Sequence, residues 1–166
     1  ISDQVFEYWK QNKQLQVEFD TTPGTSADEV PFNSGTNLHV RIRNDRHRVT
    51  VPFDERSRGF VWFFSFLAYF SELDGSAPGS LILLLDEPGL SLHGKAQGDL
   101  LRFIDEKLAS RFQVIYTTHS PFMIAPGKFE RVRTVEDVDG AGTVIGKDVL
   151  KNDQDTIFPL QAALGY

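Results

Sequence analysis

The chain contains no cysteine among its 166 residues. Disulfide bonds and thiolate zinc sites are therefore excluded, and the composition suits a reducing compartment, so we expect a cytoplasmic protein. No apolar run reaches the roughly 18 residues that a membrane-spanning helix needs, and no signal peptide is visible at the first residue. We therefore expect no membrane partner.

An excess of positive charge is also missing. The formal net charge is −6 at pH 7, with 17 Lys and Arg against 23 Asp and Glu. Broad DNA-binding faces are usually basic, so this balance argues against such a face on this chain. The length suits one globular domain or a large part of one.

The most informative feature is an apolar run that leads directly into two carboxylates, in the sequence LILLLDEP at 81–88. A short, continuously apolar run predicts a strand buried on both faces, as in a parallel α/β sheet. Ligands of such sheets bind at the carboxyl ends of the strands. There Asp86 could hold Mg²⁺ near a phosphate, and Glu87 could orient an attacking water. The alternative is a buried strand that happens to end in acidic residues.

A second buried strand is predicted in the sequence QVIYTTHSP at 113–121, which carries His119 at its polar end. A helix predicted from about His93 to Leu108 separates the two strands, so parallel pairing would place His119 at the edge that carries the two acids. A lone histidine at a strand end is often only hydrogen-bonded within the fold, and this alternative stays open. Zinc is a poor explanation, since the four histidines form no ligand pair at helical spacing.

A helix start is predicted at Ser57, where RSRG at 56–59 precedes a long aromatic helix from Phe60 to Leu73. Ser57 would cap this helix by accepting a hydrogen bond from a first-turn amide. Free amides and the positive end of the helix dipole also make such a start a natural anion site. Large apolar residues recur at helical spacing, which predicts core packing. They are Trp62, Phe63, Phe66, Leu67 and Phe70.

Together these segments resemble the ABC-type ATPases, and among them the OLD (overcoming lysogenisation defect) family. The resemblance is carried by FDERSRGFVWF at 53–63, DEPGL at 86–90 and TTHSPF at 117–122, and it extends to FPLQAALGY at 158–166. It covers most of the chain from about Leu38 onward. The order of the motifs corresponds to a signature segment, a Walker B strand with its D-loop, and a switch histidine.

The resemblance implies an ATP site with Mg²⁺. Asp86 would hold the metal, mostly through water, and Glu87 would orient or deprotonate the attacking water. His119 would sense the γ-phosphate. ATP hydrolysis is therefore the expected activity of the intact protein.

The resemblance also implies that a head-to-tail homodimer completes the site. Ser57, Arg58 and Gly59 would form a divergent signature motif that contacts the ATP held by the partner subunit. Ser91 and His93 would lie in the D-loop at the dimer interface. His93 could equally be a surface histidine. DNA is a possible partner through other parts of the parent protein.

One part of such ATPases is absent from the sequence. The phosphate-binding pattern G-x-x-x-x-G-K-[ST] does not occur, because Gly94-Lys95 is followed by Ala96 and no glycine-rich loop leads into it. We therefore expect the chain to be the C-terminal half of an ABC-type ATPase domain, with the phosphate loop upstream of Ile1. In the OLD family a TOPRIM nuclease follows, but its acidic metal-binding clusters cannot be identified before Tyr166.

The predicted fold class is α/β, a P-loop NTPase with a mainly parallel core sheet, flanking helices and antiparallel hairpins. We expect a helix, loop and hairpin in 1–53, the signature-to-switch region in 54–125, and an edge hairpin with a terminal helix in 126–166. The finer predictions are a helix at 3–12, a strand at 15–19, an exposed loop at 21–36, hairpins at 38–53 and 131–145, and a helix at 158–166.

Further details are predicted for the helix at 93–108. Ser91 would cap it, and apolar residues would form a buried stripe that comprises Leu100, Leu101, Ile104 and Leu108. Charged residues would face water, namely Asp99, Arg102, Asp105, Glu106 and Lys107.

Two functions from other classes remain open beside the ATPase. The first is a non-catalytic interaction module that keeps the fold but binds no nucleotide. The second is a DNA-repair ATPase of the RecF or SMC kind. The presence of both Glu87 and His119 favours an ATPase over an inert module, and the acidic charge balance disfavours DNA contact by this part of the chain.

Overall fold

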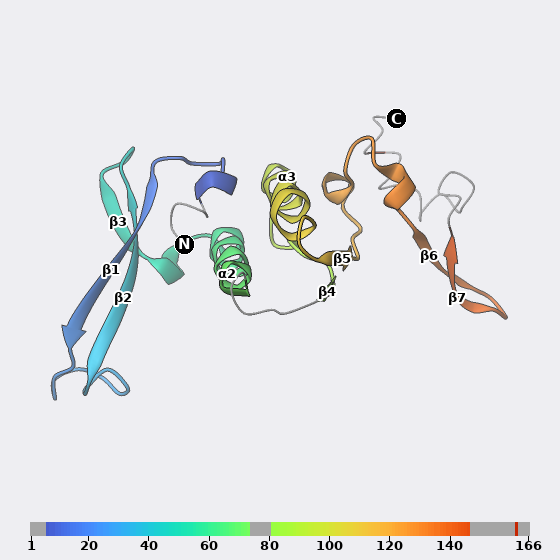
Figure 1. Cartoon of the computed structure of the whole chain (residues 1–166). Helices are drawn as coiled ribbons and strands as arrows, with labels where there is room; N and C mark the ends of the chain where they lie inside the picture. Colours follow the sequence, from blue (N-terminus) through green and yellow to red (C-terminus); the bar gives the residue numbers. More distant parts are fainter. Residues whose placement is uncertain (1–5, 74–80, 147–161, 163–166) are drawn as a thin grey trace. The chain divides into compact units, whose positions relative to one another are not determined.

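The structure, a computed structural model, describes residues 6–73, 81–146 and 162. The chain divides into two compact units, Ile1–Ala77 and Pro78–Tyr166 (Figure 1). No helix in the described ranges is long and apolar enough to cross a membrane. The helix predicted at 158–166 lies outside the described residues, apart from Ala162.

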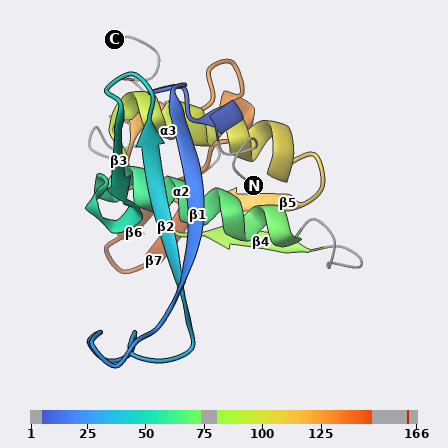
Figure 2. The same cartoon turned by 90° about the vertical axis from the view of Figure 1, so that its left-hand side faces the viewer.

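The first unit contains an antiparallel sheet in the order β1-β2-β3. β1 (Leu15–Pro23) pairs with β2 (Thr36–Asn44), and β2 pairs with β3 (Val49–Pro52). Figure 2 shows β1 and β2 as one long two-stranded ribbon. The predicted strand and hairpin are confirmed, but the loop is shorter than predicted. The strands extend into it because its threonines are β-branched and fit a strand.

The first helix is also shorter than predicted. Residues 6–8 are helical, and residues 3–5 lie outside the described part of the chain. The side chain of Asn12 accepts a hydrogen bond from the amide of Gln14 at 2.9 Å. This local bond lies beyond the end of the helix at Tyr8, and it favours a turn at Asn12.

The long aromatic helix of the first unit is confirmed. It follows a short 3₁₀ turn, η1 (Phe53–Glu55), and forms α2 (Arg58–Glu72). Phe63, Leu67 and Phe70 are buried as predicted. Trp62 and Phe66 are only half-buried and stack on each other with ring centroids 5.0 Å apart. The core also takes Phe60 and Phe64 of this helix.

The second unit is built on a parallel pair of strands. β4 (Ile82–Leu85) pairs with β5 (Gln113–Tyr116), and α3 (Gly94–Phe103) joins them and continues as a short π-helix, η3 (Ile104–Leu108). Figures 1 and 2 both show α3 along one face of this pair. The predicted α/β fold with a parallel sheet is therefore confirmed. Two 3₁₀ turns and a hairpin follow, namely η4 (Pro121–Met123), η5 (Phe129–Arg131), β6 (Thr134–Val138) and β7 (Gly142–Gly146).

The described residues of the second unit cover the β4–β5 sheet on one face, whereas burial on both faces was predicted. Leu83, on the face that α3 covers, is 8% exposed, whereas Leu84 on the opposite face is 74% exposed. Ile82 and Ile115 are each 52% exposed. A continuous apolar run does not alternate between apolar and polar residues. The sequence therefore could not show which face of the strand the described residues would cover.

The buried stripe of α3 and η3 is confirmed at Leu100, Ile104 and Leu108. Asp99 was predicted to face water, but its residue is only 7% exposed. It lies three residues after Ala96 and next to Leu100, at the boundary of the buried stripe. Its carboxylate lies 4.0 Å from the guanidinium of Arg102, one turn further along the helix.

The prediction that Ser91 caps this helix is wrong. The helix begins at Gly94, and the ring Nδ1 of His93 accepts a hydrogen bond from the amide of Ala96 at 3.4 Å. A turn at 87–92 comes first, with the amide of Leu92 donating to the carbonyl of Gly89 at 2.9 Å. This turn delays the start of the helix and leaves Ser91 exposed before it.

Candidate active site

The end of β4 delivers two carboxylates into a tight turn. Asp86 follows the strand directly, and Glu87 adopts a φ of +44°. This left-handed conformation is uncommon for a residue that is not glycine. Gly89, with a φ of +76°, continues the turn, and the amide of Leu90 donates to the carbonyl of Glu87 at 3.3 Å. The turn therefore fixes the direction in which Glu87 leaves the sheet.

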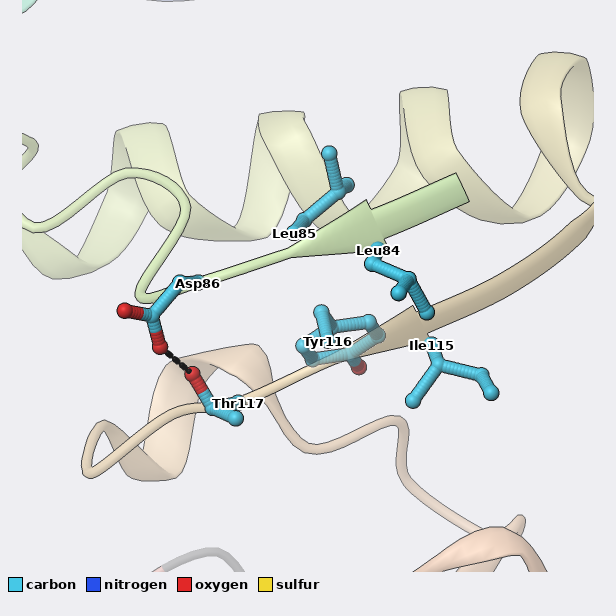
Figure 3. Close-up of a pocket in the computed structure, with 6 residues that line it drawn as sticks. All are labelled: Leu84, Leu85, Asp86, Ile115, Tyr116 and Thr117. Carbon is cyan, nitrogen blue, oxygen red and sulfur yellow. Dashed lines mark hydrogen bonds between the residues drawn. The ribbon is translucent and has the colours of Figure 1, made fainter. Parts of the chain in front are cut away.

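The end of β5 supplies a hydroxyl that reaches both acids. Thr117 continues the strand pairing, since its amide donates to the carbonyl of Leu85 at 3.0 Å. Its Oγ1 donates to Oδ1 of Asp86 at 2.6 Å and accepts from the amide of Glu87 at 3.0 Å. Figure 3 shows Asp86 and Thr117 pointing toward each other from the ends of their strands.

His119 lies at the same edge. Its Nε2 is 3.4 Å from Oε1 of Glu87. The His119 side chain is 95% exposed, whereas that of Glu87 is 28% exposed. The structure thus brings Asp86, Glu87 and His119 together, with His119 free to meet a ligand from solvent. Their roles in catalysis stay predictions.

A buried amide, which the sequence did not reveal, joins the loops that follow the two strands. Gln97 on α3 is 7% exposed. Its Nε2 donates to the carbonyl of Gly89 at 3.1 Å, and its Oε1 accepts from the hydroxyl of Ser120 at 2.6 Å. One side chain therefore connects the turn after β4 to the loop after β5. A glutamine beside Ala96 on the buried face of the helix was the available signal.

The oxygen donors at this edge fit a magnesium ion shared with a nucleotide. Proteins usually hold Mg²⁺ through one or two carboxylates, with waters and substrate phosphates completing the shell. Oδ2 of Asp86 has no hydrogen-bond partner among the described residues, while Oδ1 is engaged by Thr117. Within the described ranges, no group of three acidic or histidine residues could hold a metal by itself.

An open hollow of about 200 Å³ lies beside Asp86 on the exposed face of the β4–β5 sheet (Figure 3). Asp86 and Thr117 line one end, and the remaining lining residues are Leu84, Leu85, Ile115 and Tyr116. This lining has no cationic group to match a triphosphate. Groups that bind the phosphates of ATP would therefore have to come from elsewhere.

Tyr116 anchors the loop after β5. Its hydroxyl donates to the carbonyl of Met123 at 2.6 Å. Burial raises the pKa of Tyr116, and the negative charge of Asp105 raises it further. Asp105 is itself paired with Lys128 and lies 3.5 Å from a guanidinium nitrogen of Arg131. The loop that carries His119 is thus fixed on both sides of the histidine.

The predicted signature residues belong to the first unit. The side chain of Ser57 accepts from the amide of Phe60 at 3.3 Å, so its predicted capping role is confirmed. Ser57 and Arg58 are exposed, and Gly59 is half-buried. Helix geometry leaves the amides of Arg58 and Gly59 without intrahelical partners. Arg56 differs from Arg58, because its guanidinium lies over the ring of Phe60, 5.3 Å from the centroid.

A protein-family model matches residues 2–125, and its description is "AAA domain, putative AbiEii toxin, Type IV TA system". The chain is 26% identical to the uncharacterized protein MJECL43 of Methanocaldococcus jannaschii, over 99% of this chain and 41% of that protein. It is 28% identical to the OLD nuclease of Thermus scotoductus, over 74% of this chain and 22% of that protein. The chain thus spans less than half the length of these curated relatives.

Solved structures with a similar fold include SMC ATPases. One comes from work on their ATP-driven dimerization and DNA-stimulated activation; it gives a TM-score of 0.62 at 15% identity, over 99% of this chain and 91% of that chain. Another is the Smc head domain with an extended coiled coil bound to the C-terminal domain of ScpA, from Pyrococcus furiosus. It gives a TM-score of 0.55 at 13% identity, over 99% of this chain and 37% of that chain. These likenesses show that the chain shares its fold with the SMC ATPase structures.

Proposed function

The chain belongs to the AAA domain family whose model it matches, and from this premise we propose that it is the part of an ATPase that carries the acids, the histidine and the signature helix of the ATP site. One observation carries the proposal. Asp86, Glu87 and His119 meet at the carboxyl ends of two paired parallel strands, where ligands of such sheets bind.

The three residues have different tasks in the proposed reaction. Asp86 holds Mg²⁺, which neutralises phosphate charge when it is bound. Glu87 orients the attacking water and accepts its proton, because its carboxylate is the partly buried one and faces the ligand edge. His119 contacts the γ-phosphate, since it is exposed and lies 3.4 Å from Glu87.

The signature helix acts on the ATP of a second copy of the protein. Its first amides point out of the helix start, and the positive end of the helix dipole favours an anion there. Ser57 and Gly59 close on the γ-phosphate, and Arg58, which is exposed, adds positive charge. Ser91 lies in the exposed turn before α3 and touches the partner subunit. Hydrolysis therefore requires a head-to-tail dimer.

The parent protein is proposed to be of the OLD type. A relative named OLD nuclease and the motifs quoted above support this assignment. Because the 166 residues contain no phosphate-binding loop, the isolated chain is expected not to turn over ATP. It is also expected not to nick supercoiled DNA with Mg²⁺ or Mn²⁺. Nicking by the isolated chain that is lost in Asp86→Ala would place the nuclease centre in this chain and contradict the proposal.

An SMC-like role is the second candidate, because the solved structures of similar fold include SMC ATPases. The two candidates differ in the outcome of one assay. DNA that stimulates ATP hydrolysis by the intact protein without being cut favours the SMC-like role. Metal-dependent DNA cleavage by the intact protein favours the OLD type.

The ATPase assignment is tested by Glu87→Gln in the intact protein, with Glu130→Gln as control. Glu130 is an exposed glutamate of the same unit. Glutamine keeps the size of glutamate but cannot accept a proton, so hydrolysis should fall by about 10²- to 10⁴-fold. Binding of a fluorescent ATP analogue should change little in either variant. Normal phosphate release by Glu87→Gln would contradict the assignment.

A further inference from the structure

The hydroxyl of Thr117 is hydrogen-bonded to both acidic residues of the site. It lies 2.6 Å from Oδ1 of Asp86 and 3.0 Å from the backbone nitrogen of Glu87. These contacts join residues 31 and 30 positions apart in the chain. They connect the end of β5 to the end of β4 at the point where the ligand is expected.

The direction of both hydrogen bonds follows from the groups involved. A backbone N–H can only donate, so the oxygen of Thr117 accepts from Glu87. The hydroxyl then donates its one hydrogen bond to Oδ1 of Asp86. Oδ1 is thereby committed within the protein, and Oδ2 is left to face a ligand.

The same hydroxyl also holds Glu87. The backbone of Glu87 is left-handed, with a φ of +44°. A residue other than glycine adopts this conformation only when its surroundings hold it there. The bond from its amide to Thr117 is a direct restraint on that conformation. Loss of the hydroxyl would therefore release the carboxylate of Asp86 and the backbone of Glu87 together.

We propose that Thr117 is a positioning residue that orients Asp86 toward the metal and Glu87 toward the attacking water. The proposal rests on the ATPase function proposed above. A purely structural role for the hydroxyl fits less well. Thr117 is exposed, and the strand pairing at this point runs through its backbone amide, which bonds to Leu85 at 3.0 Å and survives any side-chain change.

Three variants of the intact protein test this role. Thr117→Val keeps the shape but removes the hydroxyl, and Thr117→Ser keeps the hydroxyl. Thr143→Val makes the same chemical change at an exposed strand position of β7. The first readout is the Mg²⁺ concentration that half-saturates binding of a fluorescent ATP analogue, measured with Glu87→Gln also present so that no hydrolysis occurs. The second is kcat and KM of ATP hydrolysis.

Thr117→Val is expected to raise the half-saturating Mg²⁺ concentration and to lower kcat, each by about 10- to 100-fold, the usual effect of removing a group that orients a metal ligand. The KM for ATP at saturating Mg²⁺ should change much less. Thr117→Ser should restore both values to near those of the wild type, and Thr143→Val should leave them unchanged.

The outcomes separate this proposal from the ATPase assignment. If Glu87→Gln abolishes hydrolysis while Thr117→Val binds Mg²⁺ and hydrolyses ATP like the wild type, the positioning role is wrong and the ATPase assignment stands. If Glu87→Gln hydrolyses normally, the ATPase assignment itself fails. If Thr117→Val does not fold, Thr117→Ala replaces it. Misfolding of both would show that the hydroxyl serves stability and would overturn the proposal.

Discussion

The two halves of the proposed ATP site are held in different ways. At the start of α2, the cap joins Ser57 to Phe60, three residues away. At the ends of β4 and β5, bonds join residues 23 to 31 positions apart, through Thr117 and Gln97. The first half is local and depends on one helix. The second depends on two loops that keep their positions relative to each other.

This difference predicts where substitutions do damage. A local cap can be lost without moving anything beyond its helix turn. A bond between two distant loops fixes both, so its loss alters the geometry of Glu87 and His119 even though neither is substituted.

His119→Ala should lower the hydrolysis rate of the intact protein by about 10²-fold, the usual cost of removing one donor to a developing charge. The free energy of unfolding should hardly change, because the side chain is 95% exposed. His47→Ala, an exposed histidine in the β2–β3 turn, is the matched control and should have no effect on either quantity. If His119→Ala hydrolyses ATP at the rate of the wild type, His119 has no role in hydrolysis.

Gln97→Leu should lower the free energy of unfolding by about 1 to 3 kcal/mol. The substitution leaves the carbonyl of Gly89 and the hydroxyl of Ser120 without their partner. Urea unfolding measures the loss, and Gln113→Leu at an exposed position of β5 provides the control. An equal effect of the two substitutions would show that the two loops do not depend on the buried amide.

Ser57→Ala should lower the free energy of unfolding by about 1 kcal/mol, the typical loss for an N-cap. Ser57→Asp keeps a capping oxygen and should retain the stability of the wild type, but it places negative charge where the partner's γ-phosphate is proposed to dock. ATP hydrolysis should therefore fall in Ser57→Asp although thermal unfolding is unchanged. Full activity of Ser57→Asp would show that Ser57 caps the helix but does not contact the γ-phosphate.

Tyr116→Phe should lower the free energy of unfolding by about 1 kcal/mol at neutral pH, because the carbonyl of Met123 loses its donor. Burial raises the pKa of Tyr116 above its value in the unfolded chain, so the folded state keeps the phenol proton to higher pH. The associated stability is complete below about pH 10 and is lost as the pH rises through the raised pKa. Tyr116→Phe should therefore show a weaker loss of stability than the wild type as the pH rises above about 10.

Much of the fold could be predicted because its signals are local. The strand before Asp86, the hairpin of β2 and β3 and the cap at Ser57 each follow from neighbouring residues. The residues brought together at the sheet edge could also be anticipated, since parallel strands end at a common edge. Each of these features is signalled by residues only a few positions apart in the sequence.

The remaining features depend on contacts that the sequence does not display. Thr117 and Gln97 acquire their roles only when distant loops meet. The turn at 87–92 displaced the helix start and made His93 the cap in place of Ser91. The exposed face of Leu84 could not be foreseen, because a continuously apolar strand gives no indication of which face will be covered.

The most direct test of the central claim is the oligomeric state of the intact protein with ATP and Mg²⁺, measured by size-exclusion chromatography with light scattering. Glu87 is proposed to act on an ATP whose γ-phosphate is contacted by the start of α2 from a second subunit. Glu87→Gln should therefore accumulate as a dimer with ATP and remain a monomer without it. Adding Ser57→Arg should abolish the dimer while ATP binding persists, because a bulky side chain then occupies the docking position. A Glu87→Gln protein that stays monomeric with ATP, or one whose dimer survives Ser57→Arg, would contradict the account.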